Sequence, residues 1–80
     1  MDDAEVIRRI GALVEEEHSL ERATGVGGPD DETAARLSDV EVALDQCWDL
    51  LRQRRARREM GDDPDDAQVR PPEIVERYQQ

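Results

Sequence analysis

Five apolar residues recur at alternating steps of three and four positions between residues 31 and 60, and this spacing constrains the fold more than any other feature of the chain. Such steps align side chains in one stripe along an α-helix, as in the seam of a coiled coil. No proline interrupts the stretch, and Gly61 stands where a helix commonly ends. The sequence therefore predicts one long helix, about 45 Å in length at 1.5 Å per residue. The stripe consists of Leu37, Val40, Leu44, Cys47 and Leu51.

A shorter apolar stripe precedes it and predicts a first helix over residues 4 to 23, capped by the aspartate at position 2 or 3. The loop from 24 to 30 supplies glycines and a proline that end this helix, and the aspartate at 30 or 31 can cap the next one. Two unequal helices joined by a short loop predict an antiparallel helical hairpin. The apolar members of the first helix are Val6, Ile7, Ile10, Leu13, Val14 and Leu20.

The tail from residue 61 to 80 is acidic and rich in proline, so it cannot extend the long helix. A short helix is predicted at about 72 to 78, with Ile74, Val75 and Tyr78 as a small apolar face. One or two turns are not stable alone in water, so this helix must dock to persist. We therefore expect residues 1 to 80 to form a single all-α domain.

The long helix carries more apolar surface than one antiparallel neighbour can cover. Around the seam, Ala34, Ala43, Trp48 and Leu50 widen the apolar arc to roughly 200°. A hairpin with such an arc would expose a large apolar patch, and twofold pairing is the commonest way to bury one. We therefore predict a homodimer in which two hairpins form a four-helix bundle. In the alternative, the tail alone closes the gap and the protein is a monomer.

An arginine block, Arg52 to Arg58, carries a charge of +5 in a chain whose net charge is -10. Acidic runs flank the block on both sides, and they would repel the phosphates of a nucleic acid. Arg54, Arg55 and Arg58 continue the direction of the seam. We expect them to pair with carboxylates of the acidic tail or of the first helix's start.

Glu17 lies within the apolar arc of the first helix, where a charge must reach solvent or find a partner. It either bends out of a loosely packed seam or pairs with an arginine across an interface, and we predict the arginine. Cys47 in the seam should behave as a small buried hydrophobe, and Trp48 as an interface anchor. The predicted interface comprises Glu17, Leu37, Val40, Leu44, Cys47, Trp48, Leu51, Arg54, Arg55 and Arg58.

No catalytic motif accompanies these residues. Glu15 and His18 have the Glu-x-x-His spacing of di-iron bundles, but a single copy on a polar face is typical of a solvated surface. We expect no enzyme activity, no cofactor and no metal. The chain has no apolar run that could span a membrane, no basic leader and one cysteine, which favour a cytoplasmic protein. Its basic residues are all arginine, which is typical of a GC-rich bacterial source.

Two stretches resemble a known family: "LVEEEHSLE" early and "LDQCWDLLRQRRARREMGDDPDDAQVRPPEIVERY" late. They are similar to the small bacterial proteins of the domain of unknown function family 2630, and the Cys-Trp-Asp-Leu-Leu-Arg-Gln-Arg-Arg run is the most specific part. The resemblance implies that the proline-rich tail belongs to the domain, and it implies no activity, substrate or cofactor.

The function that these patterns favour is a non-enzymatic module for protein–protein interaction or self-association. Its partner would be a second copy or another, unidentified protein. The alternative is a nucleic-acid-associated protein that uses the block from Arg52 to Arg58.

Overall fold

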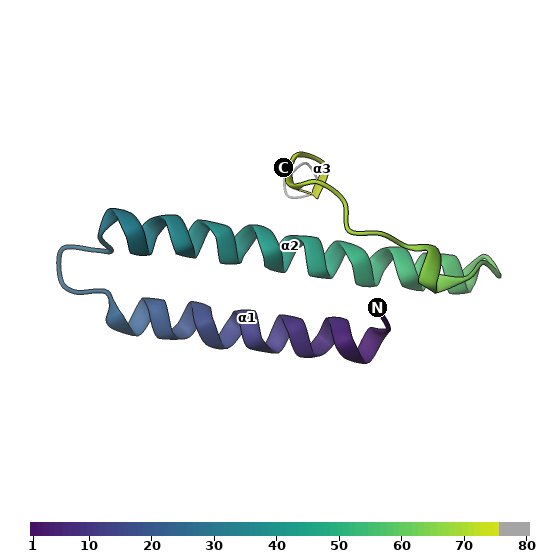
Figure 1. Cartoon of the computed structure of the whole chain (residues 1–80), viewed down its shortest axis with the longest axis horizontal. Coiled ribbons are helices and arrows are strands. Elements are labelled where there is room, and N and C mark those ends of the chain that lie inside the picture. The colour runs from purple at the N-terminus through teal and green to yellow at the C-terminus, as the bar shows by residue number, and fades with distance from the viewer. Residues whose placement is uncertain (76–80) are drawn as a thin grey trace.

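Two long antiparallel helices form the body of the molecule (Figure 1). The structure is a computed structural model that describes residues 1–75. Helix α1 spans Asp3–Ala23 and helix α2 spans Asp31–Glu59. They lie side by side in an elongated molecule of 51 × 25 × 15 Å. The predicted all-α hairpin with unequal helices is confirmed, and each helix end lies within one residue of its expected position.

Each long helix begins at an aspartate that satisfies exposed backbone N–H groups. Asp2 accepts a hydrogen bond from the N–H of Glu5 at 2.8 Å, and the Glu5 carboxylate accepts one from the Asp2 N–H. Asp30 accepts from the N–H of Thr33 at 2.7 Å. Helix α2 ends before Gly61, whose φ of +81° is a conformation that glycine adopts without steric cost. Of the candidate caps in the sequence, Asp2 and Asp30 are thus the ones used.

The tail folds back along α2. It contains a 3-10 turn, η1, at Pro64–Asp66 and a short helix, α3, at Pro72–Val75. Both contact α2, and α3 lies on the side of α2 opposite α1 (Figure 1). Val75 is buried, so the short helix docks on its own chain. The part of the predicted helix beyond Val75, including Tyr78, falls outside the described residues.

The core lies where the first half of α1 meets the second half of α2. Val6 and Ile10 of α1 pack there in one cluster with Leu50 of α2. Ala67 of the tail packs against the same cluster, so three segments of the chain build it. The partly buried side chains around the cluster are Val14, Leu44, Cys47, Leu51 and Ala67.

The tail covers part of the surface that the sequence suggested a second chain would bury. It packs along the second half of α2, where a two-helix hairpin would have left the seam open. The coverage is incomplete, because Trp48 on α2 and Ile7 on α1 remain about half exposed. The monomeric alternative is therefore realised in part, and the predicted dimer stays a prediction.

The core makes a direct prediction about two valines. Val6 is fully buried, whereas Val26 in the loop is fully exposed. We expect Val6→Ala to lower the free energy of unfolding by about 2 kcal/mol, which corresponds to roughly 8 to 16 °C in Tm. Val26→Ala, which removes the same two methyl groups from an exposed position, should leave Tm nearly unchanged in thermal melts followed by circular dichroism. Equal melting of the two variants would contradict the core described above.

Candidate functional site

Arg54 joins three segments of the chain at one point. Its side chain is 6% exposed, and its Nε donates to Asp3 of α1 at 2.5 Å. Its Nη1 donates to the Asp65 carboxylate at 2.9 Å and to the Pro64 carbonyl at 3.2 Å, both in η1. The hydrogen bond to Asp3, followed by the one to Asp65, raises the pKa of Arg54. The start of α1, the second half of α2 and the turn of the tail are therefore held together by one guanidinium.

Arg55 directly follows Arg54, Arg58 lies one turn further along α2, and the two differ in what they contact. Arg58 forms a bidentate pair with Asp3, with its Nη2 2.8 Å from Oδ2. The Arg58 hydrogen bond, followed by that of Arg54, lowers the pKa of Asp3. Arg55 lies 3.4 Å from Glu59 on the exposed surface. Carboxylates of the tail and of the first helix thus both bind arginines of the block, as the sequence indicated.

Asp49 is the most deeply buried charge among the described residues, with no exposed surface. Arg70 of the tail donates to both carboxylate oxygens of Asp49, from Nη2 to Oδ1 and from Nε to Oδ2 at 2.8 Å. Gln53 donates to the same carboxylate oxygen at 2.9 Å. The hydrogen bond from Arg70 is the main cause of a lowered Asp49 pKa, and burial opposes it. The tail is therefore fastened to α2 by a satisfied, buried ion pair.

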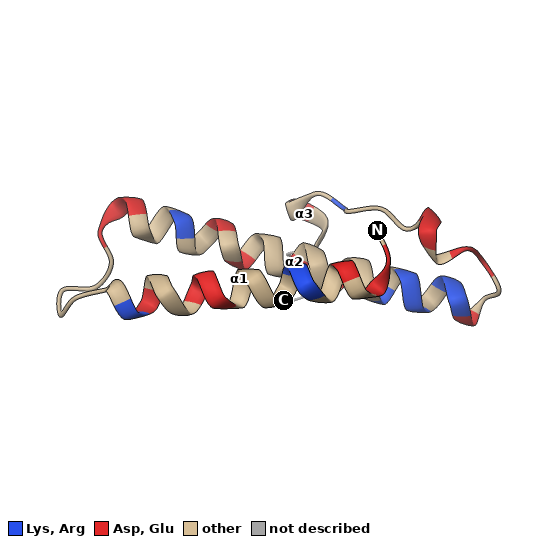
Figure 2. Cartoon of the chain, turned by 60° about the horizontal axis from the view of Figure 1, so that its bottom comes forward, with Lys and Arg blue, Asp and Glu red and all other residues tan. Residues whose placement is uncertain are grey.

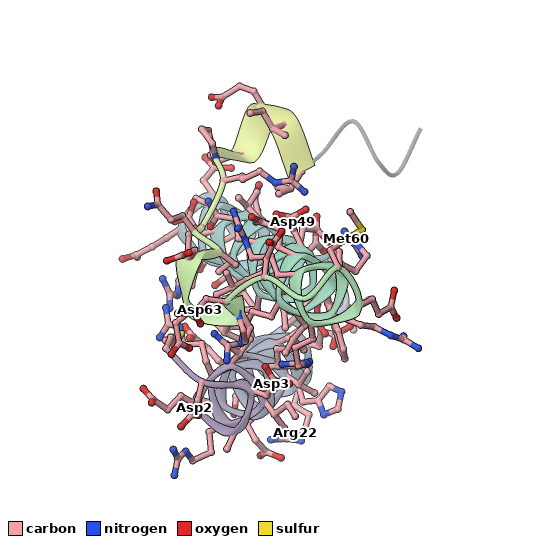
Figure 3. The ribbon with its side chains drawn as sticks, turned by 90° about the vertical axis from the view of Figure 1, so that its right-hand side faces the viewer. Asp2, Asp3, Arg22, Asp49, Met60 and Asp63 are labelled. Carbon is pink, nitrogen blue, oxygen red and sulfur yellow. The ribbon has the colours of Figure 1, made fainter. Side chains whose placement is uncertain are left out.

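Two amides complete this attachment. Gln53 donates to the Gln68 carbonyl at 2.7 Å, and Gln46 donates to the Arg70 carbonyl at 3.1 Å. Figure 3 looks along the helices and shows Asp49 on the side of α2 nearer the tail, with Asp2 and Asp3 on α1 beneath. The apolar spacing of the sequence predicted neither Asp49 nor Arg70 as a site residue. The only sequence signal for this pair was the position of Arg70, a cation directly before two prolines in an acidic tail.

The predicted seam lies mostly inside the chain. Val40 is buried, and Leu44, Cys47 and Leu51 are half-buried against the core cluster. Leu37 is also half-buried. Burial raises the pKa of the Cys47 thiol, which disfavours the reactive thiolate. These residues therefore contribute to packing within one hairpin.

Trp48 differs from the seam because it lies at the surface with 51% exposure. It lines a shallow groove together with Leu44 of α2 and three carboxylates. Glu17 of α1 is one of them, and within residues 1–75 it forms no ion pair. The arginine predicted to face Glu17 across an interface therefore stays a prediction. The full lining is Glu17, Glu41, Leu44, Asp45 and Trp48.

Glu17 also belongs to a small group of potential metal ligands. Single ligand atoms of Glu17, His18 and Glu21 lie within 4.8 Å of one another on one turn of α1. His18 and Glu21 are exposed, and residues at this spacing on any helix come equally close. Proximity alone therefore does not distinguish this turn from an ordinary solvated surface.

Across the described residues, the helices are too short or too polar to cross a membrane. The fold and its contacts define a small all-α helical hairpin whose C-terminal tail is attached to α2 through arginine–carboxylate pairs.

The chain belongs to the family described as "Protein of unknown function (DUF2630)", which matches residues 2–80. The resemblance noted in the sequence is confirmed. Uncharacterized proteins of Mycobacterium tuberculosis (Rv0898c) and Mycobacterium bovis (Mb0922c) are each 48% identical to it over 77 residues. The matches cover 95% of this chain and 88% of each relative. No solved structure matches the chain.

The arginine contacts predict unequal effects of equal substitutions. Arg54→Gln removes the bond between three segments and should lower Tm by about 5 °C or more. Arg55→Gln changes a side chain that is 78% exposed and should leave Tm within about 2 °C of wild type. Thermal melts at low salt compare the two variants directly. A larger fall in Tm for Arg55→Gln than for Arg54→Gln would mean that Arg54 is not the residue that joins the three segments.

The buried ion pair predicts a loss of stability in acid. Because the folded-state pKa of Asp49 lies below its ordinary value of 3.8, its contribution is present above that pH. The contribution is lost as the pH falls through the folded-state pKa, and Asp3 acts in the same direction.

We expect Asp49→Asn to lower the free energy of unfolding by about 2 kcal/mol at pH 7. In strong acid, the difference in the free energy of unfolding between this variant and wild type should become smaller. Urea titrations across the pH range measure both effects. Asp39→Asn, at an exposed position of the same helix, serves as the control. A gap that stayed constant with pH would mean that the charge of Asp49 is not what stabilises the tail.

Proposed function

We propose that this protein is a non-enzymatic interaction module that acts through the groove around Trp48. One observation carries the proposal. The chain's single tryptophan lies half exposed beside Leu44 in an otherwise strongly charged molecule. Exposed tryptophans are enriched among the residues that dominate binding energies in protein interfaces, because they bury a large rigid surface at low entropic cost.

The other conspicuous side chains already have structural roles, which supports the Trp48 groove as the binding surface. Arg54, Arg58 and Asp49 hold the tail and the two helices together. Cys47 is half-buried with a raised pKa, so it is poorly suited to nucleophilic chemistry. A structural role accounts for all four side chains, which leaves the Trp48 groove as the surface with a binding character.

The nucleic-acid alternative is less favoured because two arginines of its basic block are already engaged. Arg54 is buried, and Arg58 is paired with Asp3. A phosphate backbone would have to compete with these carboxylates and approach a chain of net charge -10. Salt-dependent binding to generic duplex DNA that is reduced by Arg52→Gln and Arg57→Gln would favour this alternative.

We also propose that the module works in the cytoplasm. Its single cysteine cannot form a disulfide within the chain, and its stability depends on ion pairs and a small core, which need no oxidising compartment.

The test uses Trp48 as its own reporter, since no other tryptophan contributes to the fluorescence. We expect acrylamide quenching to weaken when the protein associates, because association buries the indole. Trp48→Glu should abolish association in sedimentation velocity and in affinity capture from cytoplasmic extract. Val26→Glu, which places the same charge on the exposed loop, should retain both. Equal association of wild type and Trp48→Glu in both sedimentation velocity and affinity capture would refute the proposal.

A further inference from the structure

One side of α2 faces neither α1 nor the tail and carries an ordered pattern of charge. At about 100° per residue, eight side chains of α2 fall within an arc of roughly 80°. This arc is centred roughly 80° from the mean direction of the seam that packs on α1, and roughly 80° to 140° from the three residues of α2 that bind the tail through side-chain hydrogen bonds, Asp49, Gln53 and Gln46. From the N-terminal end, the eight are Ala34, Leu37, Glu41, Asp45, Trp48, Arg52, Arg55 and Glu59. We call this side the Trp48 face.

The charges of the Trp48 face change sign at the tryptophan. Between Glu41 and Arg55, acidic residues precede Trp48 and arginines follow it, and Glu59, which contacts Arg55, ends the face. Figure 2 shows the same polarity on α2, with basic positions gathered toward its C-terminal end and acidic ones toward its N-terminal end. Such a pattern becomes its own complement when a second copy is laid against it in the opposite direction.

The side chains of the Trp48 face are accessible to a partner. Glu41 is exposed, and Arg55 is 78% exposed. The contact between Arg55 and Glu59 is long at 3.4 Å, and it has the arginine on the N-terminal side, the weaker order for such pairs on a helix. Asp45 and Arg52 also interact within their own chain.

We propose that the occupant of the Trp48 groove is a second copy of this chain, with the two α2 helices antiparallel about a twofold axis at Trp48. This inference rests on the proposed function and names its partner. With Trp48 on the axis, Glu41 of one copy faces Arg55 of the other, and the symmetric pair repeats the contact. The two indoles meet at the centre, where hot spots of twofold interfaces commonly lie.

Geometry and charge both favour this register. Helix α2 ends at Glu59, so the two copies overlap from residue 37 to residue 59, about 35 Å at 1.5 Å per residue. Glu17 lines the same groove. In this register Arg52 of the second copy lies close to Glu17, which therefore gains the arginine partner predicted from the sequence. A parallel pairing would set acid against acid and arginine against arginine, which electrostatic complementarity disfavours.

A charge exchange tests the register. Glu41→Arg alone sets two arginines against each other at both symmetric contacts, and Arg55→Glu alone sets two glutamates against each other. Each variant should weaken its own dimer by about tenfold or more in sedimentation equilibrium. An equimolar mixture of the two restores both attractive contacts, so it should dimerise with nearly wild-type affinity. The wild-type dimer should also weaken as salt is raised, a measurement that needs no variant.

Two controls carry the same changes of charge elsewhere. Asp39→Arg on the other side of α2 matches Glu41→Arg, and Arg8→Glu on α1 matches Arg55→Glu; both positions are exposed. Each control should dimerise as wild type does. Circular dichroism verifies that all four variants keep their helical content.

The outcomes separate this inference from the proposed function. If both charge variants dimerise as tightly as wild type, or the mixture gains nothing over either alone, the register is wrong. If wild type stays near 9.1 kDa up to millimolar concentration, the second copy is excluded. In both cases the proposed function survives if Trp48→Glu still abolishes binding to another protein, and it fails with the inference if Trp48→Glu changes nothing.

Discussion

The fold depends on Arg54. A guanidinium cannot shed its charge, so its burial requires acceptors on several sides. Asp3 and the two acceptors of η1 provide them. One acceptor comes from the start of α1 and two come from the turn of the tail. One side chain in α2's basic block therefore joins both segments to α2, in addition to the core contacts of Val6 and Ala67.

The tail illustrates docking by polar contacts with little apolar surface. Arg70 binds the buried Asp49, and two glutamines donate to carbonyls of the tail, while Ala67 and Val75 supply the apolar contacts that the structure shows. Buried ion pairs contribute modestly to stability but penalise any arrangement that leaves one partner unpaired. We infer that Asp49 fixes where the tail lies, and that the tail in turn leaves the Trp48 face of α2 open.

The three sides of α2 make different contacts, and this difference has a functional consequence. One side packs on α1, a second receives the tail, and the third carries Trp48 with Glu41 and Asp45 before it and Arg52 and Arg55 after it. Between Glu41 and Arg55 the charges on this third side are segregated by sign around an aromatic residue. Segregated charges are the usual means by which helices select the direction and register of a partner.

Much of the architecture was determined by the sequence alone. The step pattern of the seam, the glycines of the loop and Gly61 fixed two helices and their ends, because these are local requirements of helix geometry. The family was recognisable for the same reason, since its most specific run lies within one helix. The charge balance also indicated that the arginines would find carboxylates.

Only the tertiary structure decided which carboxylates these are. It selected Asp3 and Asp65 for Arg54, and it revealed Asp49 beneath Arg70 on a face of α2 that carries no apolar signal. It also showed that the tail covers one side of α2 and leaves Trp48 exposed. The physical reason is that ion pairs between distant residues have no period along the chain. Their partners become identifiable only when the backbone has brought them within a few ångströms of each other.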